Sequence, residues 1–292
     1  MGGTGKTHVV AEVARLLIAH GERPAILTRG FARTRPTPGV TIVSNGTSIL
    51  TDVAAAGDEP MMLARALPGV AVLVGADRFL SGQLAERELG VTVHILDDGF
   101  QHVTLARDVD LILVDESDLS DRVLPAGRLR EPLANASVAD AVLVTTDEPG
   151  GVARVARALG VESAFRVMRV IHSARALGAP SGAIAGHAPI LAFAGIAKPE
   201  RFFSDLTASG RQPAETMTFP DHHPYTQRDI DRIAERARAA GAARVLTTEK
   251  DAVRLEGLDL TGLRVAAIPL TATIEPTHQF AEWLFERLRQ GQ

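Results

Sequence analysis

The chain has 292 residues, enough for about two domains at roughly 150 residues each, and its 46% hydrophobic content is enough to build buried cores. A net charge of −4 argues against a protein that binds nucleic acid by neutralising phosphates. The lack of cysteine excludes disulfides, cysteine-bound zinc, iron–sulfur clusters and thiol catalysis. No apolar run reaches the ~18 residues that a membrane-spanning helix needs, and no signal peptide is recognisable.

Apolar strands alternate with helical segments along residues 1–162, which we expect to form one domain. The periodicity predicts helices at 8–20, 78–89 and 151–159. It predicts strands at 25–28, 70–74, 91–96, 109–114 and 141–145. Such alternation is typical of an α/β fold with a mostly parallel sheet.

A second, smaller α/β domain is expected at residues 187–275, after an extended linker or hairpin at 163–186. Its predicted elements are strands at 189–196, 244–247 and 263–269 and helices at 199–209 and 227–240. Residues 276–292 should form a final helix, with Phe280, Trp283, Leu284 and Leu288 at helical spacing. We expect this helix to pack on a core, and a return to the first domain is one possibility.

The start of the chain carries the distal half of a Walker A loop, which opens a helix. In such a loop glycine N–H groups and the helix N-terminus bind phosphate, Lys6 contacts the β- and γ-phosphates, and the Thr7 hydroxyl binds Mg²⁺. A glycine-rich turn before a helix is the alternative. The first consensus glycine and the usual preceding strand would fall before residue 1, so we expect a removed strand or a misassigned start. The loop residues are Gly2, Gly3, Thr4, Gly5, Lys6 and Thr7.

Two carboxylates, Asp97 and Asp98, follow directly on an apolar strand. This is the form of a Walker B element, and in a parallel sheet ligands lie at the carboxyl ends of the strands. Asp97 and Asp98 should therefore lie beside the phosphate loop as oxygen ligands for Mg²⁺. A plain turn is the alternative. Asp115 and Glu116 end the next strand, where we favour a structural role.

Only three of the 31 basic residues are lysines, which makes each retained lysine a candidate for function. Lys6 belongs to the phosphate loop. Lys250 is worth testing for a nucleotide or phosphate contact, although Thr248 and Asp251 around it also fit a helix-capping box. Lys198 precedes a proline at a helix start, and we expect it to be incidental.

The ordered motifs of this chain resemble the tetraacyldisaccharide 4′-kinases, and the resemblance covers nearly the whole sequence. The most diagnostic string is Asp-Asp-Gly-Phe-Gln-His at 97–102. The family carries an N-terminal membrane helix and a strand before the loop, which this sequence lacks. Phe31 and Ala32 replace the usual Tyr and Gly, so a hydroxyl role at residue 31 is in doubt. The other matching segments are 2–7, 28–31, 57–60, 124–132, 193–197, 219–223 and 247–252.

The resemblance implies a P-loop kinase that transfers the γ-phosphate of ATP to the 4′-hydroxyl of a tetraacylated glucosamine disaccharide 1-phosphate. That reaction belongs to lipid A biosynthesis. ATP and Mg²⁺ would be required, and the glycolipid substrate implies work at a membrane surface, on the cytoplasmic face of the bacterial inner membrane. The resemblance implies no nucleic-acid partner.

The resemblance also implies roles for individual residues. Asp58 would be the base that accepts the hydroxyl proton, although the sequence alone favours it as the cap of a helix at 61–67. His222 would pair with Asp58 across the domain cleft. Lys6 would neutralise the developing charge, and Thr7 with an aspartate of the Asp97–Asp98 pair would hold the metal.

Four further residues are implied as ligands of the nucleotide or the substrate. Arg130 would contact phosphate and Glu131 the nucleotide or metal, whereas the sequence alone also allows a solvated charge pair. Gln101 and His102 would orient substrate or phosphate.

Two other functions fit part of the sequence. The phosphate loop also resembles that of partitioning ATPases, but these carry a lysine before the glycines where this chain has Met1. A catalytically dead binding module derived from the kinase is the other alternative, and the retention of Lys6, Asp58 and Asp97 argues against it.

Overall fold

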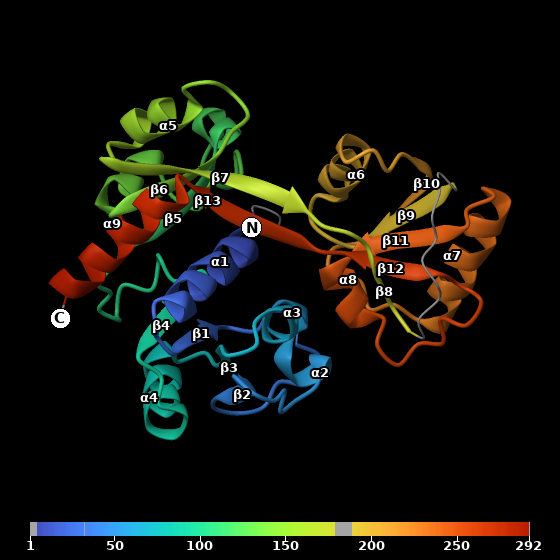
Figure 1. Cartoon of the computed structure of the whole chain (residues 1–292), viewed down its shortest axis with the longest axis horizontal. Coiled ribbons are helices and arrows are strands. Elements are labelled where there is room, and N and C mark those ends of the chain that lie inside the picture. Colours follow the sequence, from blue (N-terminus) through green and yellow to red (C-terminus); the bar gives the residue numbers. More distant parts are fainter. Residues whose placement is uncertain (1–4, 32, 179–188, 292) are drawn as a thin grey trace.

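The computed structural model describes residues 5–31, 33–178 and 189–291, which form two lobes joined by two long strands (Figure 1). The first lobe comprises the elements from α1 to β7, together with β13 and α9. The second lobe comprises the elements from β8 to β12. Gly2, Gly3 and Thr4 of the predicted phosphate loop lie outside the described residues, as does Ala32.

The first lobe contains two four-stranded sheets, and one of them is formed near the N-terminus. Its strand order is β2-β3-β1-β4, with β1, β3 and β4 parallel and β2 antiparallel to β3. Alternate residues of β1 point to opposite faces, so Ile26 packs with α1 and α3 while Leu27 packs with α4. The strands are β1 (Pro24–Thr28), β2 (Thr41–Asn45), β3 (Ala71–Val74) and β4 (Val93–Leu96). The helices are α1 (Lys6–Ala19), α2 (Val53–Ala56), α3 (Asp58–Ala66) and α4 (Arg78–Leu89).

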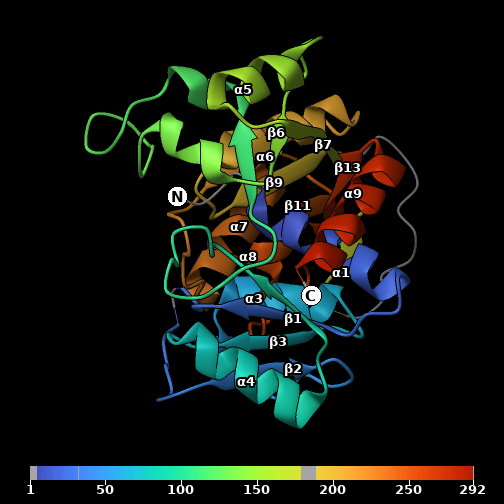
Figure 2. The same cartoon turned by 90° about the vertical axis from the view of Figure 1, so that its left-hand side faces the viewer.

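The other first-lobe sheet has the order β13-β7-β6-β5, and only β13 is antiparallel to its neighbour. Helix α5 covers one face, while α1 and α9 cover the other, so α1 lies between the two sheets (Figure 2). The strands are β5 (Leu111–Asp115), β6 (Ala141–Thr145), β7 (Ser163–Ile171) and β13 (Leu270–Glu275). The helices are α5 (Gly151–Leu159), α9 (Thr277–Gln290) and the short 3-10 helices η1 (Glu116–Ser120) and η2 (Leu133–Val138).

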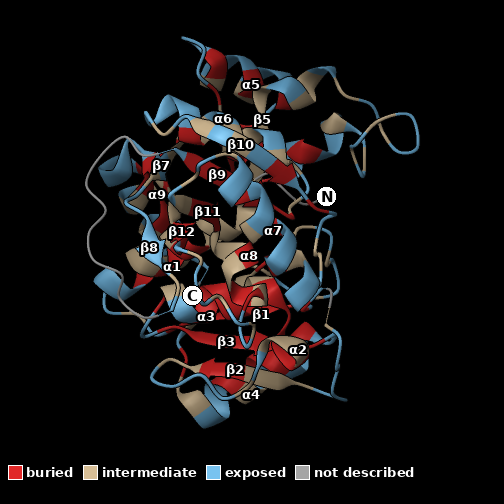
Figure 3. Ribbon diagram, turned by 90° about the vertical axis from the view of Figure 1, so that its right-hand side faces the viewer, coloured by how far each residue is buried: buried red, intermediate tan, exposed pale blue. Residues whose placement is uncertain are grey.

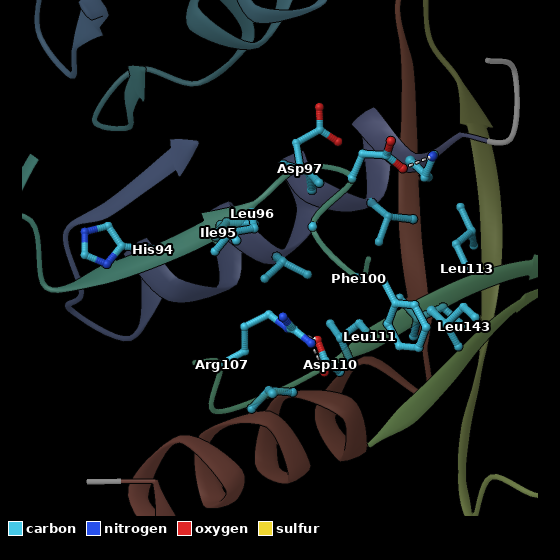
Figure 4. Close-up of a pocket in the computed structure, with 18 of the residues that line it drawn as sticks. His94, Ile95, Leu96, Asp97, Phe100, Arg107, Asp110, Leu111, Leu113 and Leu143 are labelled. Atoms are coloured by element: carbon cyan, nitrogen blue, oxygen red, sulfur yellow. Dashed lines mark hydrogen bonds and ion pairs between the residues drawn. The ribbon is translucent and has the colours of Figure 1, made fainter. Parts of the chain in front are cut away.

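A cavity of about 1180 Å³ lies between the edge strands β4 and β5 of the two first-lobe sheets, and it is referred to below as the cavity (Figure 4). Within the described residues no strand pairs with the outer edge of β4 or of β5. The side chains of β4 and β5 are consequently half-buried except for the buried Val114, whereas β1 and β3 are fully buried. The apolar part of the cavity lies between these edges, and its polar end reaches Lys6, Asp97 and Asp98.

The second lobe is a five-stranded sheet of order β10-β9-β11-β12-β8, in which only the short β8 is antiparallel. Helix α7 packs on one face and α6 on the other. Figure 3 shows the exposed outer side of α7 over buried strands. The strands are β8 (Arg175–Ala176), β9 (Ile190–Ala194), β10 (Pro213–Thr218), β11 (Arg244–Thr248) and β12 (Val265–Ile268). The helices are α6 (Pro199–Ala208), α7 (Gln227–Ala239) and α8 (Glu249–Arg254).

The predicted α/β class is confirmed, and each strand and helix predicted from periodicity is present with bounds that differ by a few residues. Two segments are arranged differently from the expected domain division. Residues 163–171, expected to be a linker or hairpin, form β7 inside a sheet of the first lobe. Strand β13, which lies within the predicted second domain of residues 187–275, pairs with β7 and so belongs to the first lobe. Residues 179–188, part of the same predicted linker, lie outside the described chain.

One further prediction from composition can be compared with the described helices. Not one of them combines the length and the apolar character that are needed to cross a bilayer.

Candidate active site

The start of α1 lies beside the carboxyl ends of β1 and β4, which are parallel neighbours in the β2-β3-β1-β4 sheet. Gly5 precedes the helix with a φ of 87°, a left-handed conformation that favours glycine. The first turn of α1, which is described in full, contains no acidic residue. Its N-terminal partial charge is therefore available to an anion. Lys6 extends to within 2.5 Å of Asp98 Oδ1.

Asp97 is a buried carboxylate at the end of β4. The Thr28 hydroxyl donates to its Oδ2 at 3.4 Å, and Lys6 is the nearby cation that favours its charged form. Burial, reinforced by the negative charge of Glu59, raises the pKa of Asp97 to about 6. A carboxylate in this environment gains from a cation placed against it.

Asp98 has the opposite electrostatic environment. Its φ of 56° places a non-glycine residue in the left-handed region and turns the side chain toward Lys6 and Arg130. Arg130 donates to Oδ2 at 2.8 Å. Burial alone would raise the pKa of Asp98, but the bonds and charges of Lys6 and Arg130 lower it to about 2.

The oxygen ligands at this point fit a magnesium ion that is held jointly with a nucleotide. Within the described chain no group of three or more His, Asp and Glu side chains forms a ready-made metal cage. Mg²⁺ typically takes one or two protein carboxylates and completes its shell with phosphates and water. Asp97 and Asp98 provide such a partial set, and Asp97, which has no ion pair with any described residue, fits the cation best.

Arg130, Gln101 and Glu131 form one chain of polar contacts that begins at Asp98. Arg130 also donates to Gln101 Oε1 at 3.1 Å, and Gln101 donates to Glu131 Oε1 at 2.9 Å. The structure thus brings three of the four predicted ligand residues together at the polar end of the cavity. His102 is not part of this chain, and its Nε2 lies 3.5 Å from the Thr104 hydroxyl.

Asp58 lies at the first position of α3 and is 3% exposed. Gly57 occupies the cap position, so the expected capping role of Asp58 is wrong. Asp58 Oδ2 instead lies 2.9 Å from His222 Nδ1 of the second lobe and 3.3 Å from Arg254 Nε. Burial would raise the pKa of Asp58, but the His222 hydrogen bond and the charges of Lys250 and Arg254 together lower it. The carboxylate is thereby kept ionised in a buried position.

Lys250 lies in the same cluster and not beside Lys6. Its Nζ is 3.0 Å from Glu59 Oε1, 3.3 Å from His222 Nε2 and 3.5 Å from Asp221 Oδ1. Thr248 caps α8 by accepting from Asp251 N at 3.0 Å, but the reciprocal bond from Thr248 N to the Asp251 side chain, which the expected capping box requires, is absent among the described residues. Because Glu59 belongs to the first lobe and Asp221 to the second, Lys250 binds carboxylates of both lobes.

Sequence reasoning missed two members of this cluster, Glu59 and Arg254. Arg254 follows Lys250 by four residues, which places both on one face of α8. That spacing was the available signal for Arg254. Glu59 could have been found only as the neighbour of Asp58.

The remaining predicted residues divide between the site and the scaffold. Phe31 is 72% exposed, and its ring centroid lies 5.1 Å from that of His222. Lys198, expected to be incidental, lines the cavity. Asp115 caps η1, and Glu116 binds Arg154 at 2.6 Å, so the structural role favoured for this pair is confirmed.

Comparison with known proteins links this site to one enzyme family. The family profile described as tetraacyldisaccharide-1-P 4′-kinase matches residues 1–289. A tetraacyldisaccharide 4′-kinase of Syntrophus aciditrophicus is 37% identical over 313 residues, which cover 99% of this chain and 82% of that protein. One from Geobacter metallireducens is 40% identical over 284 residues, covering 94% and 82%.

A solved structure of the same enzyme family also matches this chain. LpxK from Aquifex aeolicus in complex with ATP matches with a TM-score of 0.75 and 31% identity, over 98% of this chain and 85% of that one.

Proposed function

This chain belongs to the tetraacyldisaccharide-1-P 4′-kinase family, ATP-dependent phosphotransferases with an alcohol acceptor, and from this premise we propose the role of each site residue. The reaction moves the γ-phosphate of ATP to the 4′-hydroxyl of a tetraacylated glucosamine disaccharide 1-phosphate in lipid A biosynthesis. The family match also excludes the partitioning-ATPase interpretation.

The phosphates of ATP would lie at the N-terminus of α1. Backbone N–H groups and the Lys6 ammonium supply positive charge there, and phosphoryl transfer depends mainly on such positioning and charge stabilisation. Arg130 would turn from Asp98 to a phosphate oxygen when the nucleotide binds. Glu131 and Gln101, linked to Arg130, would hold that guanidinium in place.

Magnesium would be held by the Thr7 hydroxyl and the Asp97 carboxylate, and Asp98 would be a further carboxylate ligand. When bound, the ion supplies charge neutralisation to the β- and γ-phosphates. The low pKa of Asp98 keeps that carboxylate ionised for the same purpose.

Asp58 would accept the proton of the 4′-hydroxyl. One observation carries this assignment: a buried carboxylate of the first lobe is held ionised by His222, Lys250 and Arg254 of the second lobe. An acceptor sugar bound between the lobes would then meet the base on one side and the γ-phosphate on the other.

The acyl chains of the substrate require an apolar environment, and several large apolar side chains are exposed on loops and helix starts that follow the first-sheet strands. Phe31, Phe79, Leu80 and Val103 are 72%, 57%, 51% and 82% exposed. We propose that these side chains contact the acyl chains or the bilayer, on the cytoplasmic face of the bacterial inner membrane.

Transfer of labelled phosphate tests the proposed roles. The protein is incubated with γ-labelled ATP, Mg²⁺ and the tetraacyl disaccharide 1-phosphate in mixed micelles, and label is followed into the lipid. We expect transfer with the wild type and a large loss with Asp58→Asn. Equal transfer by both would remove Asp58 from the base role.

A further inference from the structure

We propose that Lys250 fixes His222 in the tautomer that carries its proton on Nδ1, so that the imidazole donates to Asp58. Lys250 is thus a positioning residue that acts on the base through His222. The inference deepens the function proposed above, because it rests on Asp58 as the base.

The contacts of the imidazole define its two nitrogens differently. Nδ1 lies 2.9 Å from Asp58 Oδ2, and Nε2 lies 3.3 Å from Lys250 Nζ. A lysine ammonium has three donors and no acceptor, so Nε2 can bond to it only as an unprotonated acceptor. A neutral imidazole with an unprotonated Nε2 carries its hydrogen on Nδ1, where Asp58 accepts it.

Asp221 is the group that would favour the other tautomer. Its Oδ2 lies 3.7 Å from His222 Nε2 and could accept a proton from that nitrogen. Lys250 is nearer to Nε2 and also lies 3.5 Å from Asp221 Oδ1. The ammonium therefore opposes Asp221 both by occupying Nε2 and by pairing with the carboxylate.

The backbone of His222 is held in place independently of Lys250. Its φ is 58°, and its backbone N–H donates to Gly195 O at 3.2 Å and to Asp221 Oδ1 at 3.0 Å. The side chain is 16% exposed. With the backbone fixed and the side chain largely buried, a change of tautomer changes the hydrogen bonding of the ring without moving the main chain.

Arg254 cannot replace Lys250 in this role. It lies 3.3 Å from Asp58 Oδ2 and is held by Asp251 at 3.0 Å, by Gly195 O at 3.0 Å and by His223 O at 3.2 Å. Within the described part of the chain, Arg254 makes no hydrogen bond or ion pair with the His222 ring. Among the described residues, the charged groups nearest the pair are Glu59, Asp221, Lys250 and Arg254, and of these only Lys250 can donate to Nε2.

Nitrogen NMR of protein labelled with ¹⁵N-histidine reads the tautomer directly. In the wild type we expect the protonated-nitrogen signal at Nδ1 of His222. In Lys250→Met the signal should move toward Nε2, since Asp221 is then the one remaining partner of that nitrogen among the described residues, and Lys250→Arg should keep the wild-type pattern. A proton on Nε2 in the wild type, or an unchanged pattern in Lys250→Met, would overturn the proposal.

Kinetics give the second readout. Lys250→Met should lower kcat at least about tenfold, leave the KM for ATP unchanged and be partly rescued by arginine. The matched control is Arg65→Met. It breaks another ion pair between the lobes, in which Arg65 lies 2.6 Å from Glu256, and this pair does not involve His222. An equal loss of kcat in the control would assign Lys250 only to lobe docking.

The two hypotheses fail separately. If Asp58→Asn keeps its activity while the tautomer still depends on Lys250, the base assignment is wrong and the tautomer inference stands.

Discussion

Asp58 and His222 are 164 positions apart in the chain, yet their side chains meet at 2.9 Å across the two lobes. Asp58→Asn preserves the shape of this contact and removes the proton acceptor. We expect kcat to fall by about 10²–10⁴, because that is the usual contribution of general-base catalysis. ATP affinity, measured by calorimetry, should stay near the wild-type value, and a parallel loss of both would indicate a folding defect instead.

Lys6→Met should reduce phosphoryl transfer by roughly 10²-fold or more, in line with the loss of one preorganised charge at a transition state. The substitution keeps the aliphatic stem, so α1 should remain folded. Transfer kinetics and circular dichroism check the two parts. Lys198→Met, at another lysine that lines the cavity, serves as a comparison, and an equal effect there would argue against a special role for Lys6.

Arg130→Lys tests the network that joins Asp98, Gln101 and Glu131. A lysine keeps the charge but lacks the planar fork that contacts two acceptors at once, so we expect the KM for ATP to rise about tenfold. Steady-state kinetics at saturating glycolipid measure the change. An unchanged KM would show that Arg130 does not contact the nucleotide.

The stability of the lobe interface should depend on pH through Asp58. Its pKa is lowered in the folded protein, so its ionised form stabilises the fold above the ordinary aspartate value of about 3.9. That stabilisation is lost as the pH falls through the lower folded-state pKa. Thermal unfolding should therefore separate wild type from Asp58→Asn at pH 6 and bring them closer below pH 4. A gap that is constant over this range would contradict the prediction.

Phe280→Ala should destabilise the first lobe by about 3–5 kcal/mol, the usual cost of deleting a buried phenylalanine side chain. Phe280 is 0% exposed and packs edge-on against Phe165 of β7 at 5.0 Å between ring centroids. Chemical denaturation measures the loss. His278→Ala, in the same helix but with a side chain 84% exposed, should change stability little.

Local patterns account for the parts of the fold and site that the sequence predicted. The start of α1 at Lys6 follows from the glycine before it, and the position of Asp97 follows from its place at the end of an apolar strand. These features depend on a few neighbouring residues, so a single sequence is enough to recognise them.

Long-range packing decides the features that could not be predicted. Lys250 was a candidate phosphate ligand because it is rare, but its partners Glu59 and Asp221 lie on different lobes. The alternating pattern of β13 cannot tell whether it pairs with β12 or crosses to β7. Only the complete arrangement of the lobes determines these neighbours.

The crossing of β13 and α9 back to the first lobe has a consequence for synthesis on the ribosome. The sheet that contains β5, β6 and β7 receives its edge strand from residues 270–275 and much of the cover on one face from residues 277–290. The first lobe therefore cannot complete its core until residues 270–290 have been translated, although most of its sequence emerges earlier. During that interval β7 presents an unpaired edge, the kind of edge that can pair wrongly with another chain.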